Sequence, residues 1–420
     1  MRRFRAISPR STPKDSSISS RIARSPRSRT SWRRGRRMII DIDSHFEPGS
    51  DWLEPYPELA KRLPKVDPAL LAVHTIDVPE AERPPVAELL PPGLLTLFGE
   101  EKAGEAARRA EFAGKQQFQK ANASARVKWL DGQGIARQNV ICLSGIAQTL
   151  FLEDRALRQE TLAASNSWLA GTCDEANGRL LPVTVLEFED VDWIVAELTR
   201  MRGRGSRIFL IPGYPVNGIP PTHPSWDRVW SAATDLGMAP MLHTGFEHTR
   251  IDPGWANAGA DVTFVRQFGG SFRHFAPTTL INSMIYSGVF ERHPKLTLLL
   301  AEVGVGWLPF LYREIDDRIS PTAELFVGSW KYPMKPSEYL ARNVRGTPLS
   351  AGNDSPIRKI IEELPEDMIV FSSDFPHFEG FTDPIGHYAT ALADLKPERR
   401  DRFFGGAIAD VYARMGDPIQ

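Results

Sequence analysis

Short apolar runs alternate with longer segments of mixed polarity along most of the chain. Apolar runs that end in polar or turn residues are typical of buried parallel strands, and the longer segments between them are typical of helices. We predict eight strands, of which the first begins at Ile39. The other seven are expected at 139–143, 180–186, 207–211, 240–243, 296–301, 340–344 and 368–371. Helices are expected at 101–129, 154–177, 191–201, 226–236, 278–290, 308–319 and 355–364, with two more at 384–395 and 397–415.

Eight strands with helices between them predict an α/β fold of the (β/α)8 type, the TIM barrel, whose sites lie at the carboxyl ends of the strands. Residues 38–420 would form this single domain. The stretch 49–125 reads as a long insertion after the first strand, because Pro55, Pro57 and Pro64 forbid a continuous helix in its first part. We expect the insertion to form either a lid over the site or a surface for a partner.

Composition and charge limit the class of protein. The 420 residues are 42% apolar and 25% charged, which is enough apolar material for a large core. No stretch of about 18 uncharged apolar residues occurs, so we expect no membrane span. Residues 1–37 carry a net charge of +12 and the whole chain −1, so residues 38–420 carry −13. An acidic body argues against nucleic acid as a partner. Two cysteines, Cys142 and Cys173, are too few for a disulfide framework and favour a cytoplasmic setting.

The first 37 residues are rich in Arg, Ser and Pro and poor in large apolar residues, so this segment alone cannot bury enough surface to fold. Three interpretations stay open: a transit-like presequence, a basic arm for an anionic partner, or sequence upstream of the true start. Met38 stands directly before the first strand, which favours the third interpretation. We therefore predict that residues 1–37 are a disordered basic extension.

Ionisable side chains follow several of the predicted strands. Asp41, Asp43 and His45 occupy every second position at the first strand, so Asp43 and His45 share one face. Similar residues stand at the ends of three later strands: His243, Glu302, Asp374 and His377. Each alone is typical of a cap or a solvated loop group. Because the carboxyl ends of barrel strands converge, one mixed nitrogen and oxygen site for a metal explains them together.

Four further residues stand near the predicted mouth of the barrel. His223, His248 and His274 are candidates to reach it, and Arg273 is a candidate to hold an anionic group of a substrate. The alternative for each is a solvated loop residue.

Four segments together resemble the amidohydrolase superfamily. They are Asp41–Pro48, Met241–Gly245, His293–Pro309 and Phe371–His377, and they occur in barrel order. The resemblance runs from Ile39 to about Met415 and is strongest to the branch around aminocarboxymuconate-semialdehyde decarboxylase. It implies a metal-dependent barrel with ligands from the first, fifth and eighth strands.

Carried over residue by residue, the resemblance implies that His45, His243 and Asp374 bind the metal. Asp43 stands where the first histidine of the family's pair is usual, and we expect it to bind as well. Glu302 replaces a histidine of the sixth strand. The fourth predicted strand, 207–211, has no lysine to bridge two ions, which favours one divalent ion, zinc first and manganese as the alternative.

The resemblance favours a decarboxylase that acts on a small carboxylated, aromatic or unsaturated substrate. Glu302 favours the alternative, a hydrolase of an amide, ester or thioester; a barrel that binds a ligand without catalysis is a third possibility. We expect Asp374, Glu302 and His377 to be catalytic. Glu302 has other interpretations: a metal ligand, an anchor for the histidines, or a structural acid. The predicted partners are a small molecule and a second copy of the chain.

Overall fold

The computed structural model describes residues 38–46, 48, 51–63, 122–149, 152–246, 271–348, 357–377, 380–416 and 418. Residues 38–420 make up one compact unit. The first 37 residues and most of the predicted insertion lie outside the described ranges. Among the described residues no helix is long and apolar enough to cross a membrane.

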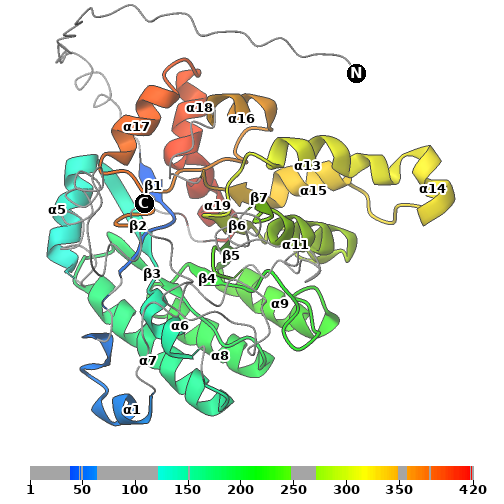
Figure 1. The fold of residues 1–420 in the computed structure, drawn as a ribbon. Helices are drawn as coiled ribbons and strands as arrows, with labels where there is room; N and C mark the ends of the chain where they lie inside the picture. Colours follow the sequence, from blue (N-terminus) through cyan, green and yellow to red (C-terminus); the bar gives the residue numbers. More distant parts are fainter. Residues whose placement is uncertain are drawn as a thin grey trace, which may run out of the picture. The chain divides into compact units, whose positions relative to one another are not determined.

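A curled sheet of seven parallel strands forms the centre of this unit, with the strands in sequence order (Figure 1). The strands are β1 (Ile39–Asp41), β2 (Ile135–Val140), β3 (Leu180–Thr184), β4 (Ile208–Leu210), β5 (Ala239–His243), β6 (Leu298–Ala301) and β7 (Val344–Gly346). Almost every strand residue is buried, because helices cover the outside of the sheet and side chains fill its inside.

Helices connect the strands and surround them in Figure 1. Those that follow β2 to β7 are α6 (Leu143–Thr149), α7 (Arg155–Asp174), α8 (Val191–Arg202), α9 (Asp227–Leu236), α11 (Phe275–Tyr286), α12 (Val289–Arg292), α13 (Leu308–Glu314), α14 (Pro321–Val327), α15 (Pro336–Asn343) and α16 (Ile357–Glu363). The carboxyl-terminal helices are α17 (Pro384–Ala391), α18 (Pro397–Asp401) and α19 (Ala407–Arg414), and the π-helical turn η7 (Arg402–Gly406) joins the last two.

Local sequence signals set several of these helix ends. The carboxylate of Asp154 accepts hydrogen bonds from the first backbone amides of α7. Gly237 ends α9 at a positive φ of 63°, as predicted, and a Cβ there would lie 2.6 Å from the carbonyl oxygen of Met415. Only glycine fits this turn, which returns the chain into β5.

The described part of the predicted insertion is short. It comprises the turn η1 (Asp51–Leu53), α1 (Pro57–Arg62) and the first residues of α5 (Ala123–Gln133), the helix that leads into β2. Trp52, Leu53 and Leu59 form a small apolar cluster with residues of α7, including Trp168. The beginning of the insertion is thereby fixed to the outside of the sheet. Whether the rest forms a lid lies outside the described residues.

Two predicted strands are wrong. The run Leu340–Val344 lies mostly in α15, because its buried positions Pro336, Tyr339, Leu340 and Asn343 recur with helical spacing and Pro336 begins the helix. The strand there, β7, begins only at Val344. The run Met368–Phe371 makes one bridge, between Gly346 and Ile369, instead of a strand.

The segment 368–375 nevertheless lies between β7 and the end of β1. The amide of Gly346 donates to Met368 (2.8 Å) and that of Val370 donates to Gly346 (3.0 Å). Farther on, the amide of Asp374 donates to the carbonyl of Asp43 (3.0 Å). Two amides in between leave the sheet pattern: Phe371 donates to Phe403 of η7, and Ser373 donates to the side chain of Asp41. The ladder is interrupted at these two positions, which explains why no eighth strand forms.

Candidate metal centre

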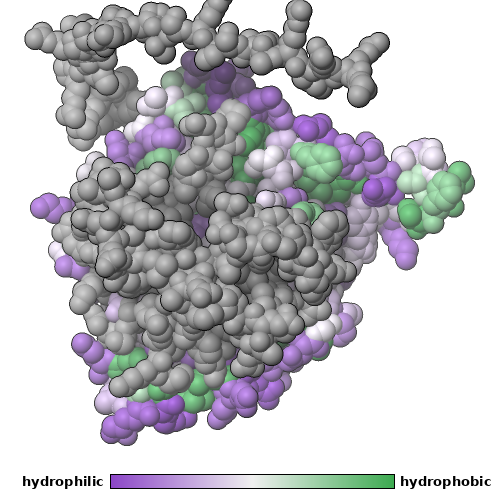
Figure 2. Space-filling model, in the orientation of Figure 1, coloured by the Kyte–Doolittle hydropathy of each residue, from purple (hydrophilic) through white to green (hydrophobic). Residues whose placement is uncertain are grey.

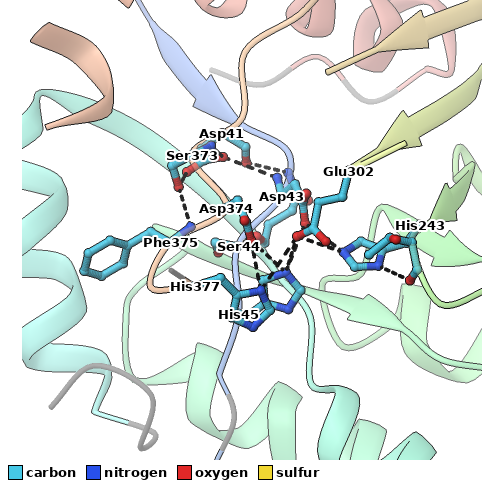
Figure 3. Close-up of polar contacts among 12 residues, drawn as sticks. Asp41, Asp43, Ser44, His45, His243, Glu302, Ser373, Asp374, Phe375 and His377 are labelled. Atoms are coloured by element: carbon cyan, nitrogen blue, oxygen red, sulfur yellow. Dashed lines mark hydrogen bonds and ion pairs between the residues drawn. The ribbon is translucent and has the colours of Figure 1, made fainter. Parts of the chain in front are cut away.

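Six ionisable side chains meet at the carboxyl ends of the strands (Figure 3). They come from the segment after β1, the end of β5, the residue after β6 and the segment after Phe371: Asp43, His45, His243, Glu302, Asp374 and His377. All six were predicted from the sequence, although only their common position, and not their individual roles, follows from the geometry.

Alternation along the backbone places Asp43 and His45 on one face, as predicted. Both side chains are fully buried, and the intervening Ser44 points away, donating its hydroxyl to the carbonyl of Asn139 (2.8 Å). The amide of His45 donates to the carbonyl of Phe375 (2.9 Å), which joins this segment to the one that carries Asp374. Two backbone segments from opposite ends of the chain therefore hold the centre together.

The Nε2 atom of His45 lies in the middle of three carboxylates. Oxygen atoms of Glu302, Asp374 and Asp43 lie at 3.2, 3.4 and 3.5 Å from it. The ring of His45 also stacks on that of His377, with 3.7 Å between ring centroids. Three acids surround one imidazole in a place that water hardly reaches, so a positive charge there would be stabilised.

His243 presents a nitrogen to the same place. Its Nδ1 lies 2.7 Å from the carbonyl oxygen of Thr244, an atom that can only accept, so Nδ1 carries the hydrogen. Nε2 then faces the acids, 3.4 Å from Glu302 and 3.6 Å from Asp43. This is the orientation of a metal-binding histidine whose other nitrogen is fixed by the backbone.

The donor atoms fit a divalent ion. Two groups of four residues offer ligand atoms within 4.8 Å of one another, and His45 and Glu302 belong to both. One group adds Asp43 and His243, and the other adds Asp374 and His377. Both oxygens of Asp43 and Nε2 of His243 are buried and make no hydrogen bond within the described chain. Nitrogen and oxygen donors of this kind suit zinc or manganese.

The pKa values follow from burial and from this crowding of charge. Burial works against a charged His243, but Glu302 and Asp43 raise the pKa of its ring well above the usual value. Burial likewise works against a charged Glu302, yet His243 and the other two histidines hold the pKa of its carboxyl well below the usual range. The space between these groups therefore favours a cation.

In the second pair, Asp374 and His377, the pKa of the acid is raised, whereas that of Glu302 is lowered. Burial and the nearby Glu302 raise the pKa of Asp374 to about 7. Burial and His45 oppose a charged His377, but Asp374 and Glu302 outweigh them and raise the pKa of His377 to about 9. Its Nδ1 lies 3.0 Å from Asp374. His377 is also the most exposed of the six, with 19% of its side chain accessible.

Two of the acids sit on unusual backbone. Glu302 has a φ of 57° and Asp374 a φ of 51°, in the left-handed region that residues with a side chain rarely adopt. Such a conformation costs about 1–3 kcal/mol and tends to occur at functional sites. In both cases it turns the carboxylate into the centre at the end of a strand segment.

The other sequence candidates have different places. His223 is exposed and caps the short helix η4 (Pro224–Trp226), with Nδ1 accepting from the amide of Ser225. This is a structural role, and it replaces the predicted one at the mouth. Arg273 lies next to the centre, with Nη1 3.4 Å from the carbonyl oxygen of Glu302. His274 precedes α11 and packs edge-on against Phe275. His248 lies outside the described residues.

Sequence analysis missed a buried polar layer beside the centre. Arg126 of α5 is fully buried and donates to the carbonyl of His45 (2.6 Å) and to Gln138 of β2 (2.9 Å). Its guanidinium lies over the rings of Phe46 and Phe375. Burial lowers the pKa of Arg126 to about 9. The only signal in the sequence was Asp41, which shares the alternation of Asp43 and His45 and binds Gln138.

Several known proteins that are similar to this chain are decarboxylases. The chain is 24% identical over 297 residues to gamma-resorcylate decarboxylase of Rhizobium sp. (strain MTP-10005), a match that covers 64% of this chain and 81% of that one. The structure resembles 5-carboxyvanillate decarboxylase LigW of Sphingomonas paucimobilis with a TM-score of 0.60 at 19% identity, over 90% and 99% of the two chains.

A second solved structure, 5-carboxyvanillate decarboxylase of Novosphingobium aromaticivorans DSM 12444, has a TM-score of 0.58 at 16% identity, over 90% of this chain and 97% of that one. That structure contains manganese. Zinc is therefore no better supported than manganese as the metal of this chain. The family model described as amidohydrolase matches residues 145–414. This range includes four of the six centre residues: His243, Glu302, Asp374 and His377. With this match over more than half of its length, the chain belongs to the amidohydrolase family.

Proposed function

We propose that this protein is a metal-dependent decarboxylase of a small aromatic acid. The observation that carries the proposal is the buried cluster of three carboxylates and three imidazoles, in which His377 has the most exposed side chain. The similarity to gamma-resorcylate decarboxylase supports the choice of reaction. We further propose that the segment 368–375, although not a regular strand, closes the seven-stranded sheet into a barrel of the (β/α)8 type, with this cluster at the carboxyl end of the barrel.

Asp43, His45, His243 and Asp374 are the proposed ligands of one divalent ion, and Glu302 stands close enough to be a fifth. Such an ion acts as a Lewis acid and holds carboxylate or hydroxyl oxygens of a substrate. Zinc remains the first expectation from the sequence and manganese the alternative. Metal analysis of the purified protein, with each metal added back after chelation, distinguishes them.

The chain's own residues then have to move one proton. In decarboxylation a proton adds to the ring carbon that bears the carboxylate, the carbon–carbon bond breaks to release CO2, and its electron pair restores the aromatic ring. His377 is the proposed donor, because it is the most exposed member of the cluster and because its Nδ1 lies 3.0 Å from Asp374. Burial of the other groups excludes water from the bond that breaks.

A substrate screen tests this proposal. Hydroxybenzoates are incubated in D2O with the metal-loaded protein, and CO2 release and ring deuteration are followed separately from release of a new acid. Decarboxylation gives CO2 and one deuterium at the carbon that lost the carboxylate. Release of an acid without CO2, from an amide, ester or thioester, would instead establish the hydrolase alternative.

The variant His377→Gln examines the proton donor. We expect turnover to fall by about 10²–10⁴-fold, since general acid catalysis contributes that much. His223→Asn is the matched control, because His223 is exposed and asparagine retains its capping role. If His377→Gln keeps full turnover, the proton comes from another group.

We also propose that the chain forms a homodimer through α14 and α13. Leu325 and Phe326 are 82% exposed and Phe310 is 64% exposed, and apolar residues gather on the projecting α14 at the right of Figure 2. Apolar patches of roughly 300–600 Å² mark interaction sites, and a two-fold contact would double the covered area. Light scattering of wild type and of Leu325→Ser/Phe326→Ser tests this: the wild type should weigh twice 47.0 kDa and the variant once.

A further inference from the structure

The carboxylate of Asp41 lies next to the metal centre without belonging to it. Asp41 is the last residue of β1 and is fully buried. Its side chain does not reach the donor atoms of the centre. It contacts instead the backbone on which two of the proposed ligands are carried (Figure 3).

One oxygen of Asp41 joins the two ligand-bearing segments. Oδ1 accepts from the amide of Ser373 at 2.9 Å and from the amide of Asp43 at 3.3 Å. Asp43 is itself a proposed ligand, and Ser373 directly precedes Asp374. A single carboxylate oxygen thus links the backbone on both sides of the centre.

The second oxygen strengthens this link. Oδ2 accepts from the hydroxyl of Ser373 at 2.5 Å and from Nε2 of Gln138 at 2.8 Å. The same hydroxyl accepts from the amide of Phe375 at 3.1 Å, so Ser373 is held from both sides of Asp374. Asp374 between them has the left-handed backbone conformation that turns its carboxylate into the centre. All these groups are buried, so water does not replace a lost bond.

From these contacts we propose that Asp41 is a positioning residue that, together with Ser373, sets the distance and orientation between Asp43 and Asp374. The inference deepens the proposed function, since it rests on those two residues being metal ligands. Two backbone bonds also join the segments, from the amide of Asp374 to Asp43 and from that of His45 to Phe375. Asp41 adds the link at Ser373, whose amide leaves the interrupted ladder to reach the Asp41 side chain. Side-chain partners of this kind tune metal affinity by orienting the ligands.

An asparagine cannot replace Asp41 without loss. If its oxygen faces the amides of Ser373 and Asp43, its NH2 group meets the NH2 of Gln138. Gln138 cannot turn over to solve this, because its oxygen accepts from Arg126 at 2.9 Å. If the asparagine turns over instead, its NH2 meets the amide of Ser373. At least one contact between two donors remains in either case.

The test measures metal affinity, which does not depend on any substrate. Dissociation constants for Mn²⁺ and Zn²⁺ are determined by chelator competition for wild type, Asp41→Asn and Ser373→Ala in the full chain. We expect both variants to bind each metal about 10–100-fold more weakly than wild type. Ser373→Ala retains the backbone bond to Asp41, so it is the milder change and remains informative if Asp41→Asn does not fold.

Glu197→Gln is the matched control for loss of a buried carboxylate. Glu197 of α8 is 4% exposed and accepts from Asn166 and Arg200, away from the proposed ligands. Its variant should lose thermal stability yet bind metal within twofold of wild type. If Asp41→Asn and Ser373→Ala also bind within twofold, or if Ser373→Ala fails to fold, the positioning role is wrong. If wild type itself binds neither metal, the metal centre of the proposed function fails first.

Discussion

Glu302→Gln is the most informative change in the centre, because Glu302 replaces a histidine that the family resemblance led us to expect. Its Oε1 atom lies 3.2 Å from Nε2 of His45 and 3.4 Å from Nε2 of His243, at the point where both groups of donor atoms overlap. Glutamine retains the shape of the side chain and an accepting oxygen but removes the charge. The change therefore isolates the electrostatic contribution of this one residue.

The size of that contribution follows from the distances. The carboxylate of Glu302 and a unit positive charge about 3.3 Å away, the distance to the two histidine nitrogens, attract by about 5 kcal/mol at an effective dielectric constant of about 20. The amide oxygen of glutamine still presents a dipole, and the neighbouring groups relax, so we expect about 3–4 kcal/mol to be lost. At about 1.4 kcal/mol per tenfold change, the metal should bind about 10²–10³-fold more weakly.

Chelator competition with Mn²⁺ gives the dissociation constant, and turnover at saturating metal gives the remaining effect on catalysis. A ligand role predicts weak metal binding with turnover partly restored by excess metal. A role in proton transfer predicts unchanged metal binding and turnover lower by about 10²–10⁴-fold. If Glu302→Gln changes neither quantity by more than twofold, while the wild type binds metal, Glu302 is a structural acid and the reasoning from its distances is refuted.

Three other predictions concern the metal, the chain terminus and the pH dependence of stability. His243→Ala should lose bound metal while its circular dichroism spectrum stays that of wild type; full metal occupancy would remove His243 from the ligands. A chain that begins at Met38 should fold and bind metal, because residues 38–420 form a compact unit alone, and insolubility of the shortened chain would contradict this. Burial and the nearby Glu291 raise the pKa of Tyr339 to about 12, so the folded state holds this proton more tightly than the unfolded state. The stabilisation is present below about pH 10 and is lost as pH rises toward 12, so the urea midpoint of wild type should fall more steeply over that range than that of Tyr339→Phe.

The architecture was predictable where apolar runs and strands coincide. The predicted strand 180–186 and the observed β3 share their first residue, and the predicted helix 154–177 contains α7. Prediction was less accurate at β2, which begins at Ile135 and includes the buried polar residues Gln138 and Asn139. The first part of the strand was not predicted because these residues are polar. Their side-chain amides are buried through hydrogen bonds to Asp41 and not through apolar packing.

The common position of the site residues was predictable, because it follows from the geometry of parallel strands and does not depend on details of the rest of the fold. Alternation places Asp43 and His45 together, and parallel strands bring their ends to one edge. The partners of these side chains were not predictable. Arg126 lies in the predicted helix 101–129, and nothing in its local sequence indicates that its guanidinium is buried against the carbonyl of His45. Contacts between residues distant in sequence arise only from the folded arrangement.

The centre also explains why the chain tolerates two costly conformations. Glu302 and Asp374 occupy left-handed backbone, and together with Asp43 they place three carboxylates in a space that is almost inaccessible to water. Left-handed backbone costs about 1–3 kcal/mol per residue, and unpaired buried acids cost more. Packing does not require either cost. A glycine would remove the cost of the left-handed backbone, and an apolar residue would remove the cost of the buried acid. A positive ion among these oxygens offsets both, and it does so only if the two strained residues turn their carboxylates inward. The strain and the crowding of charge are therefore two aspects of one requirement, which is why the strained backbone occurs at two of the three crowded carboxylates.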